Sequence, residues 1–196
     1  MGKAVATTGQ GFFVFGMDPR TTVLMDATRE LATGASQQVV AGFPLSLCST
    51  GADQGKIIAL AVNTGDPFFG VSGVNRNNLY GGTTLGEWQP GAAVAYLAGI
   101  FTIRKSVFLD TNNTEQTINP FKTSFPIAAN IGSVVGVEDV ALGGTEAALL
   151  GAISLNKWIV GAPGGTHDYT NVGVILDVRE DSEVDLYIPM QVNLAA

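Results

Sequence analysis

The stretch that decides the fold is "GFPLSLCSTGADQGKIIALAVNTGDPFFGV", residues 42–71, in which short apolar runs alternate with polar turns. Leu45–Cys48 is the first run, and Pro44 before it suits the start of a strand, where no ladder hydrogen bond is lost. Lys56–Asn63 is the second run, and its β-branched, apolar character is typical of a strand buried on both faces. Asp66-Pro67 then ends this run. The stretch therefore predicts two strands joined by a polar loop.

The rest of the chain shows the same alternation of short apolar runs and turns. It contains 25 glycines among 196 residues, well above the usual ~7%, and they separate short apolar segments. Many short strands with Gly-rich turns favour a sandwich or a barrel. We therefore expect a mainly β, single-domain β-sandwich or barrel-like fold with one or two short helices. Residues 1–20 are expected to form a flexible N-terminal arm, and residues 21–196 a single β-rich domain.

Individual elements follow from local patterns. Two segments suggest a short helix, one at Met25–Gly34 with Asp26 as N-cap and Gly34 as the C′ residue, and one that follows Thr145 as its N-cap. Gly99 is expected to mark a bulge. The charged segment Arg179–Ser182 lies between two apolar runs and predicts the turn of a hairpin. Besides the two strands of the opening stretch, strands are expected at residues 12–15, 21–25, 93–101, 102–109, 172–178 and 184–192.

Two polar segments, residues 70–90 and 110–120, are expected to be long loops. Loops of that length in a compact domain are commonly functional, so both are candidate contact regions. After the second loop, Phe121, Phe125 and Ile127 stand at even spacings. This spacing predicts the apolar face of one strand.

Charge and apolarity exclude several classes of partner. The net charge is −7 and no window concentrates Lys or Arg, whereas nucleic-acid binding needs clustered cations. Apolar runs such as Ile57–Val62 are far shorter than the ~18 residues of a spanning helix, so no membrane is expected as a partner. The N-terminal segment has no apolar secretory region, which predicts synthesis in the cytoplasm. Cys48 is the single cysteine and is expected to be a buried, unreactive thiol.

We recognise no catalytic motif in the sequence. His167 is the only histidine, and its neighbour Asp168 is badly placed in sequence to orient the ring, so a loop or interface histidine is the simpler interpretation. The "GVSGV" at residues 70–74 is not a nucleophile elbow. Nothing resembles a P-loop or a dinucleotide-binding loop. We expect no enzyme activity and no cofactor.

A binding module is the alternative. Asp181, Glu183 and Asp185 stand at steps of two and could present carboxylates to Ca²⁺, although a solvated hairpin face neutralised by Arg179 is the simpler interpretation. Trp88 and Trp158 have the apolar area to stack on sugars, but such residues more often fill cores or interfaces. A carbohydrate- or Ca²⁺-binding β-sandwich therefore remains open beside a purely structural role.

Three fragments of the chain carry a family resemblance. They are "PLSL" with Pro44, Leu45 and Leu47; "GV" at Gly70 and Val71; and "YLAGIF" with Tyr96, Gly99 and Phe101. Their order and character resemble the head-decoration and capsid-cement proteins of tailed bacteriophages. The resemblance covers roughly residues 40–103, about a third of the chain.

The resemblance implies a β-rich, non-enzymatic protein on the outside of an assembled virion shell. Its partner would be the major capsid protein, and the chain would form a homo-oligomer, with a trimer favoured. Low charge suits surfaces that become buried in such an assembly, because interface cores are depleted in charged residues. A tail tube protein and a head fibre protein are alternatives within the virion.

The contact regions are expected at residues 1–20, 72–90 and 110–120. In the first region an extended arm could add a strand to a neighbour's sheet edge. The side chains expected at an interface are Phe12, Phe13, Phe15, Asn77, Tyr80, Trp88, Asn112 and Phe121.

Overall fold

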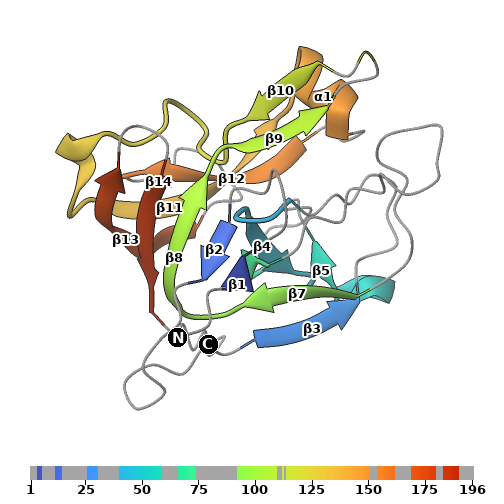
Figure 1. Cartoon of the computed structure of the whole chain (residues 1–196). Helices are drawn as coiled ribbons and strands as arrows, with labels where there is room; N and C mark the ends of the chain where they lie inside the picture. Colours follow the sequence, from blue (N-terminus) through green and yellow to red (C-terminus); the bar gives the residue numbers. More distant parts are fainter. Residues whose placement is uncertain are drawn as a thin grey trace.

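Antiparallel strands build almost all of the structure, a computed structural model (Figure 1). It describes residues 4–5, 12–14, 26–30, 40–58, 66–73, 92–109, 112, 114–150, 154–161, 169–179 and 183–189. These residues form two large sheets, one small hairpin sheet and one short α-helix.

The larger sheet has seven strands, and every neighbouring pair is antiparallel. Its strands, in spatial order, are β1 (Ala4–Val5), β2 (Phe12–Val14), β8 (Gly99–Arg104), β14 (Glu183–Ile188), β13 (Tyr169–Arg179), β11 (Val134–Ala141) and β12 (Ser154–Val160). Most of this sheet comes from the C-terminal half of the chain. The hairpin expected around the charged turn is confirmed as β13–β14.

The second large sheet has five antiparallel strands from the N-terminal half. Its strands, in spatial order, are β3 (Asp26–Glu30), β7 (Ala92–Tyr96), β6 (Phe68–Ser72), β4 (Pro44–Leu47) and β5 (Ile57–Ile58). A separate hairpin pairs β9 (Ser106–Leu109) with β10 (Glu115–Ile118). The helices are α1 (Gly144–Leu150) and the 3-10 turns η1 (Gly51–Asp53) and η2 (Ala128–Asn130).

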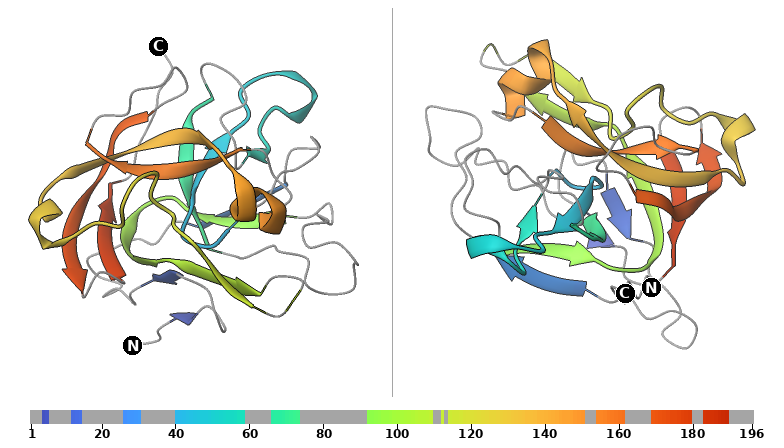
Figure 2. Two further views of the ribbon diagram at one scale, coloured as in Figure 1. Left: turned by 90° about the horizontal axis from the view of Figure 1, so that it is seen from above. Right: turned by 180° about the vertical axis from the view of Figure 1, so that it is seen from behind.

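The two large sheets pack around a shared core, which makes the fold mainly β and sandwich-like, as the composition predicted (Figure 2). The chain crosses from β7 of one sheet to β8 of the other through Leu97 and Ala98 alone. Gly99 therefore begins a strand at a corner between sheets, with φ 139°, and the bulge predicted there is absent from its regular pairing with β14.

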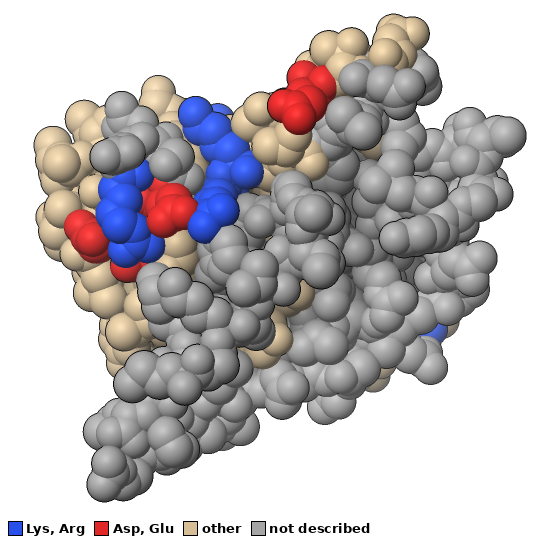
Figure 3. Space-filling view, in the orientation of Figure 1, with Lys and Arg blue, Asp and Glu red and all other residues tan. Residues whose placement is uncertain are grey.

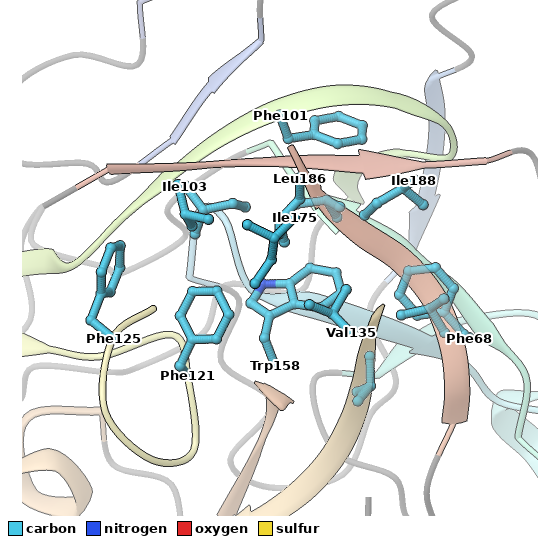
Figure 4. Packing of buried hydrophobic residues seen from close by; sticks show 14 of the residues in the cluster. Phe68, Phe101, Ile103, Phe121, Phe125, Val135, Trp158, Ile175, Leu186 and Ile188 are labelled. Carbon is cyan, nitrogen blue, oxygen red and sulfur yellow. The ribbon is translucent and has the colours of Figure 1, made fainter. Parts of the chain in front are cut away.

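The core takes one face of each strand, because side chains alternate across a sheet. In β14, Val184, Leu186 and Ile188 are fully buried, while the residues between them face away. Phe68 of β6 and Trp158 of β12 meet edge-to-face across the two sheets, with ring centroids 6.1 Å apart (Figure 4).

Two buried hydrogen bonds also join the sheets. Asn156 Nδ2 donates to Ser46 Oγ at 2.9 Å, and Trp158 Nε1 donates to the carbonyl oxygen of Gly42 at 2.8 Å. Such bonds satisfy polar groups that would be costly to bury alone. Cys48 is buried as expected, and its thiol donates to the carbonyl oxygen of Thr50.

Several predictions of local structure were wrong. The segment expected as a helix at Met25–Gly34 contains β3, because its backbone pairs with the neighbouring strand β7, which is far away in sequence. Glu115–Ile118, expected in a loop, is β10, and Gly70–Ser72 belongs to β6. Phe121, Phe125 and Ile127 do not share a strand face: the two rings are buried in an irregular segment, and Ile127 is exposed.

The second helix is confirmed as α1, although it begins at Gly144, so that Thr145, expected as the N-cap, lies inside it. Ala4–Val5 and Phe12–Val14, within the segment expected as an arm, are strands of the larger sheet. The other residues of 1–20 lie outside the described residues, as do residues 21–25, expected as a strand, and most of the loop expected at residues 70–90.

Candidate interaction face

The face of the seven-stranded sheet that points away from the core carries a line of apolar side chains. Direct partners in an antiparallel pair share a face, and the register pairs Val134 with Val174, Val174 with Tyr187, and Tyr187 with Ile100. We call these four residues the apolar row. It crosses four adjacent strands, and with strands ~4.8 Å apart it is about 14 Å long. Val134 and Tyr187 are 40% and 42% exposed.

A β-bulge extends the row with Leu176. The pairing of β13 with β14 shifts between Ile175 and Asp177, which leaves Leu176 as an extra residue that is 43% exposed. Beside it, η2 is fastened to β13, because Gly132 N donates to Ile175 O and Ile175 N donates to Ser133 O. Exposed apolar residues scattered singly are ordinary, but a contiguous group rimmed by polar residues marks an interaction surface.

Charged residues occupy the same face next to the row. We call Arg104, Asp177, Arg179, Glu183 and Asp185 the charged ladder, and Figure 3 shows such residues as interleaved blue and red patches. Arg104 pairs with Glu183 at 2.6 Å, while Arg179 binds both oxygens of Asp185, at 2.6 and 2.7 Å. Asp177, Arg179, Glu183 and Asp185 therefore share one face of the hairpin, which confirms the simpler interpretation of a hairpin face neutralised by Arg179.

Further contacts join members of the ladder to one another and to Thr102. Asp185 Oδ1 also accepts from Thr102 Oγ1 at 2.6 Å, and Arg179 Nε donates to Glu183 at 3.1 Å. The hydrogen bond to Asp185 raises the pKa of the Arg179 guanidinium further above its ordinary value, so this cation keeps its charge at any accessible pH. Both oxygens of Asp185 face donors, which is the wrong environment for a Ca²⁺ ligand.

These contacts remove Glu183, Asp185 and Trp158 as support for the Ca²⁺- and sugar-binding alternative, whose other residues, Asp181 and Trp88, lie outside the described residues. Glu183 and Asp185 neutralise arginines instead of forming an open carboxylate site. Within the described ranges, no three side chains of His, Cys, Asp or Glu come together as a metal site. Trp158 is fully buried and cannot stack on a sugar.

Replacing Arg179 with methionine should lower the free energy of unfolding by about 2 kcal/mol, because Asp185 is left half-buried beside two other carboxylates. Arg179→Lys is the matched control, since lysine keeps the positive charge but cannot bind both oxygens of Asp185 at once. Its loss in the free energy of unfolding should be smaller than that of Arg179→Met. Urea unfolding followed by circular dichroism measures both. Equal midpoints for wild type and Arg179→Met would show that the ladder does not stabilise the fold.

The side chains expected at an interface fall into four groups. Asn112 is exposed at the turn between β9 and β10, and its place at an interface stays a prediction. Phe121 is 1% exposed and packs edge-to-face against Phe125, so it fills the core, and its place at an interface was a wrong prediction for this chain. Of Phe12 and Phe13 the structure describes the backbone, in β2. The positions that lie outside the described residues are Phe15, Asn77, Tyr80, Trp88 and His167.

The apolar row was not found from the sequence. Tyr187 continues the steps of two that begin with the charged residues of β14, and this was the available local signal. Val134 and Val174 join it through strand register, which the sequence does not display.

In the part of the chain that the structure describes, no helix is long and apolar enough to cross a membrane. No protein-family model, no curated protein and no solved structure matches the chain.

Proposed function

We propose that this chain is a non-enzymatic structural protein of a phage virion, which binds the outer surface of the assembled shell and stabilises it. Its partner is the major capsid protein. One observation carries the proposal: the three fragments that resemble decoration proteins, although separated in sequence, lie next to one another in the fold.

The strand register brings the fragments together. Pro44 pairs with Val71 and Leu45 pairs with Gly70, so the first fragment lies along the second. Val71 pairs in turn with Tyr96, which begins the third fragment. The first two fragments and the start of the third thus lie on three adjacent strands of one sheet, and Gly99 and Phe101 of the third fragment continue into β8 of the other sheet.

The fragments also have matching physical roles. Leu45, Val71 and Phe101 are fully buried, and the rings of Tyr96 and Phe101 lie 6.3 Å apart. Gly70 has φ 153° and approaches the carbonyl of Tyr96 so closely that a Cβ would lie 2.5 Å from the oxygen. A set of residues that depend on one another in this way is more specific than three separate short patterns, and this supports the resemblance on which the proposal rests.

The β9–β10 hairpin is the part of the described structure that best suits contact with a shell. It extends from the end of β8 at the same end of the molecule as α1 (Figure 1) and includes part of the expected contact region 110–120. Its pairs alternate: Ser106 and Ile118 are buried, whereas Val107 and Thr117 are exposed. One side of the hairpin is thus held against the protein, and the other is open to a partner.

The test uses assembled, expanded shells of the major capsid protein from the same genome. The chain should co-sediment with these shells, leave unassembled shell subunits in the supernatant, and raise the temperature at which the shells fall apart. A partner that binds only the intact state stabilises it by about 2.7 kcal/mol per site at 100 times Kd. Shells with unchanged thermal stability would contradict the cement role, and chain found on tails but absent from tailless heads would favour a tail protein.

A substitution in the hairpin should weaken this binding. Val107→Asp places a charge on the exposed side of β9, where it must lose water when the shell covers it. We expect Kd for shells to rise at least tenfold, about 1.4 kcal/mol, with the melting temperature of the chain unchanged. Val134→Asp is the control, because Val134 is 40% and Val107 38% exposed, and they lie on different sheets. Equal loss of binding in both variants would show that the hairpin is not the specific contact.

A further inference from the structure

We infer that Lys157 is a switch that lets helix α1 detach from the sheet without leaving a buried charge unpaired. In the attached state, which the structure shows, the ammonium of Lys157 pairs with Glu146 of α1. In the detached state it pairs with Glu138 of β11 instead. The switch involves only groups of this chain, so the inference goes beyond the proposed binding to shells and does not depend on it.

Helix α1 rests on β12 through one side. Glu146 and Leu149 are three residues apart, so they lie on the same side of the helix, and Leu155 and Lys157 share one face of the strand. Leu149 packs in one buried cluster with Leu155, and Glu146 Oε2 lies 2.8 Å from Lys157 Nζ. Of the side chains that the structure describes in α1, only Leu149 is buried. Few contacts therefore hold the helix, and the ion pair is one of them.

A buried ion pair ordinarily prevents such a detachment. Lys157 is 4% exposed, and removing one partner of a buried pair leaves a charge that nothing compensates, at a high cost. Here a second carboxylate stands beside the lysine. Glu138 is the direct partner of Lys157 in the register of β11 and β12, so the two side chains are neighbours on the same face.

The carboxylate of Glu138 has an oxygen available for Lys157. Its Oε1 accepts a hydrogen bond from Lys122, whereas its Oε2 is buried and has no hydrogen-bond partner. A buried acceptor without a donor costs free energy. When Lys157 turns from Glu146 to Oε2, this oxygen gains a donor, and Lys122 keeps its own bond. The lysine is thus paired whether α1 is attached or detached, which makes α1 a two-state element.

The switch also affects the β9–β10 hairpin. Ile118 of β10 is buried in the same cluster as Leu149 and Leu155. When α1 detaches, Leu149 leaves this cluster, and the side of the hairpin that is held against the protein loses an apolar contact. The partner of Lys157 therefore determines how firmly the hairpin is held.

Amide hydrogen exchange of the full chain, followed by NMR at one pH, tests the switch. The amides of Ala148 and Leu149 report on detachment because they are bonded within the helix, and the amides of β14 are the internal reference. Glu138→Gln replaces the charged acceptor with a neutral one, which binds an ammonium less strongly. Detachment then becomes less favourable, so the two α1 amides should exchange at least threefold more slowly than in the wild type.

Lys122→Met is the matched control. It removes the same ion pair to Glu138 but leaves both oxygens of Glu138 to Lys157, so the α1 amides should exchange as fast as in the wild type or faster. Charged groups that only stabilise the fold would give faster exchange in both variants. Exchange of the α1 amides that is unchanged or faster in Glu138→Gln would overturn the inference.

Thermal unfolding provides a second measurement. Glu146→Gln should lower Tm only slightly, because Lys157 can still turn to Glu138, and it should speed exchange of the α1 amides at least tenfold. The double variant Glu138→Gln/Glu146→Gln leaves Lys157 without a carboxylate, so its loss in Tm should exceed the sum of the two single losses. Additive losses would show that Glu138 is not the second partner of Lys157, and the inference would then be wrong.

Discussion

Trp158→Ala is expected to lower the free energy of unfolding by about 3–5 kcal/mol, a large part of the stability of an ordinary domain. Trp158 is fully buried in the core that both sheets share. Removing the indole leaves a cavity next to Phe68 and takes away the hydrogen bond to Gly42. For a chain of this length each 1 kcal/mol lowers Tm by roughly 2–4 °C, so differential scanning calorimetry will resolve the change.

Trp158→Phe separates the two contributions. Phenylalanine fills most of the volume, but the buried carbonyl of Gly42 loses its donor, which costs about 1–3 kcal/mol. The expected order of Tm is therefore wild type, then Trp158→Phe, then Trp158→Ala. If Trp158→Phe is as stable as the wild type, the indole stabilises the fold by packing alone. If Trp158→Ala is as stable as the wild type, Trp158 is not central to the core.

The backbone around Trp158 should survive both substitutions. Its amide donates to Pro120 O and its carbonyl accepts from Lys122 N, each at 2.8 Å, and neither bond depends on the side chain. These bonds cover the middle of β12, which is otherwise an edge of the seven-stranded sheet. An unprotected edge can pair with another chain, so this cover should keep destabilised variants from aggregating through β12.

Local signals were sufficient for some elements. The β13–β14 hairpin could be predicted because two apolar runs flank a charged turn. The pairing between its two strands joins residues that are close in sequence. The same is true of α1, whose Ala/Leu run forms bonds within itself. The mainly β class was predicted from the many glycines that separate short apolar segments. These glycines indicate how many turns there are, but not how the strands are arranged.

Elements that depend on distant partners were missed. "DATRE" has the composition of a helix, yet Asp26 pairs with Tyr96, seventy positions along the chain, and the sheet overrides local propensity. "EQTI" was missed for a different reason: its partner β9 is close by in sequence, but the segment is polar and looks like loop. The apolar row depends on the register of four strands at once. A shift of one residue would turn its members toward the core, and no local pattern fixes that choice.

Gly70→Ala is the second substitution with a large expected effect. Gly70 adopts φ 153°, where side chains are strained, and an added Cβ would lie 2.5 Å from Tyr96 O and 3.1 Å from Tyr96 C. Both atoms belong to the backbone of the neighbouring strand and cannot move aside without breaking the pairing of β6 with β7. Strain costs about 1–3 kcal/mol and overpacking about as much again, so a loss of roughly 3 kcal/mol or more is expected.

Two other glycines isolate these causes. Gly132 has φ 84° but nothing within 4 Å of an added Cβ, so Gly132→Ala should lose only the conformational cost, about 1 kcal/mol. Gly143 has neither a positive φ nor a close neighbour, so Gly143→Ala should leave the unfolding midpoint nearly unchanged. Chemical denaturation of the three variants should therefore rank Gly143, Gly132 and Gly70 in order of increasing loss. If Gly70→Ala loses no more than Gly132→Ala, the close approach of β6 to Tyr96 is not a constraint. Gly70, one of the residues on which the proposed resemblance to decoration proteins rests, would then have no structural reason in this chain.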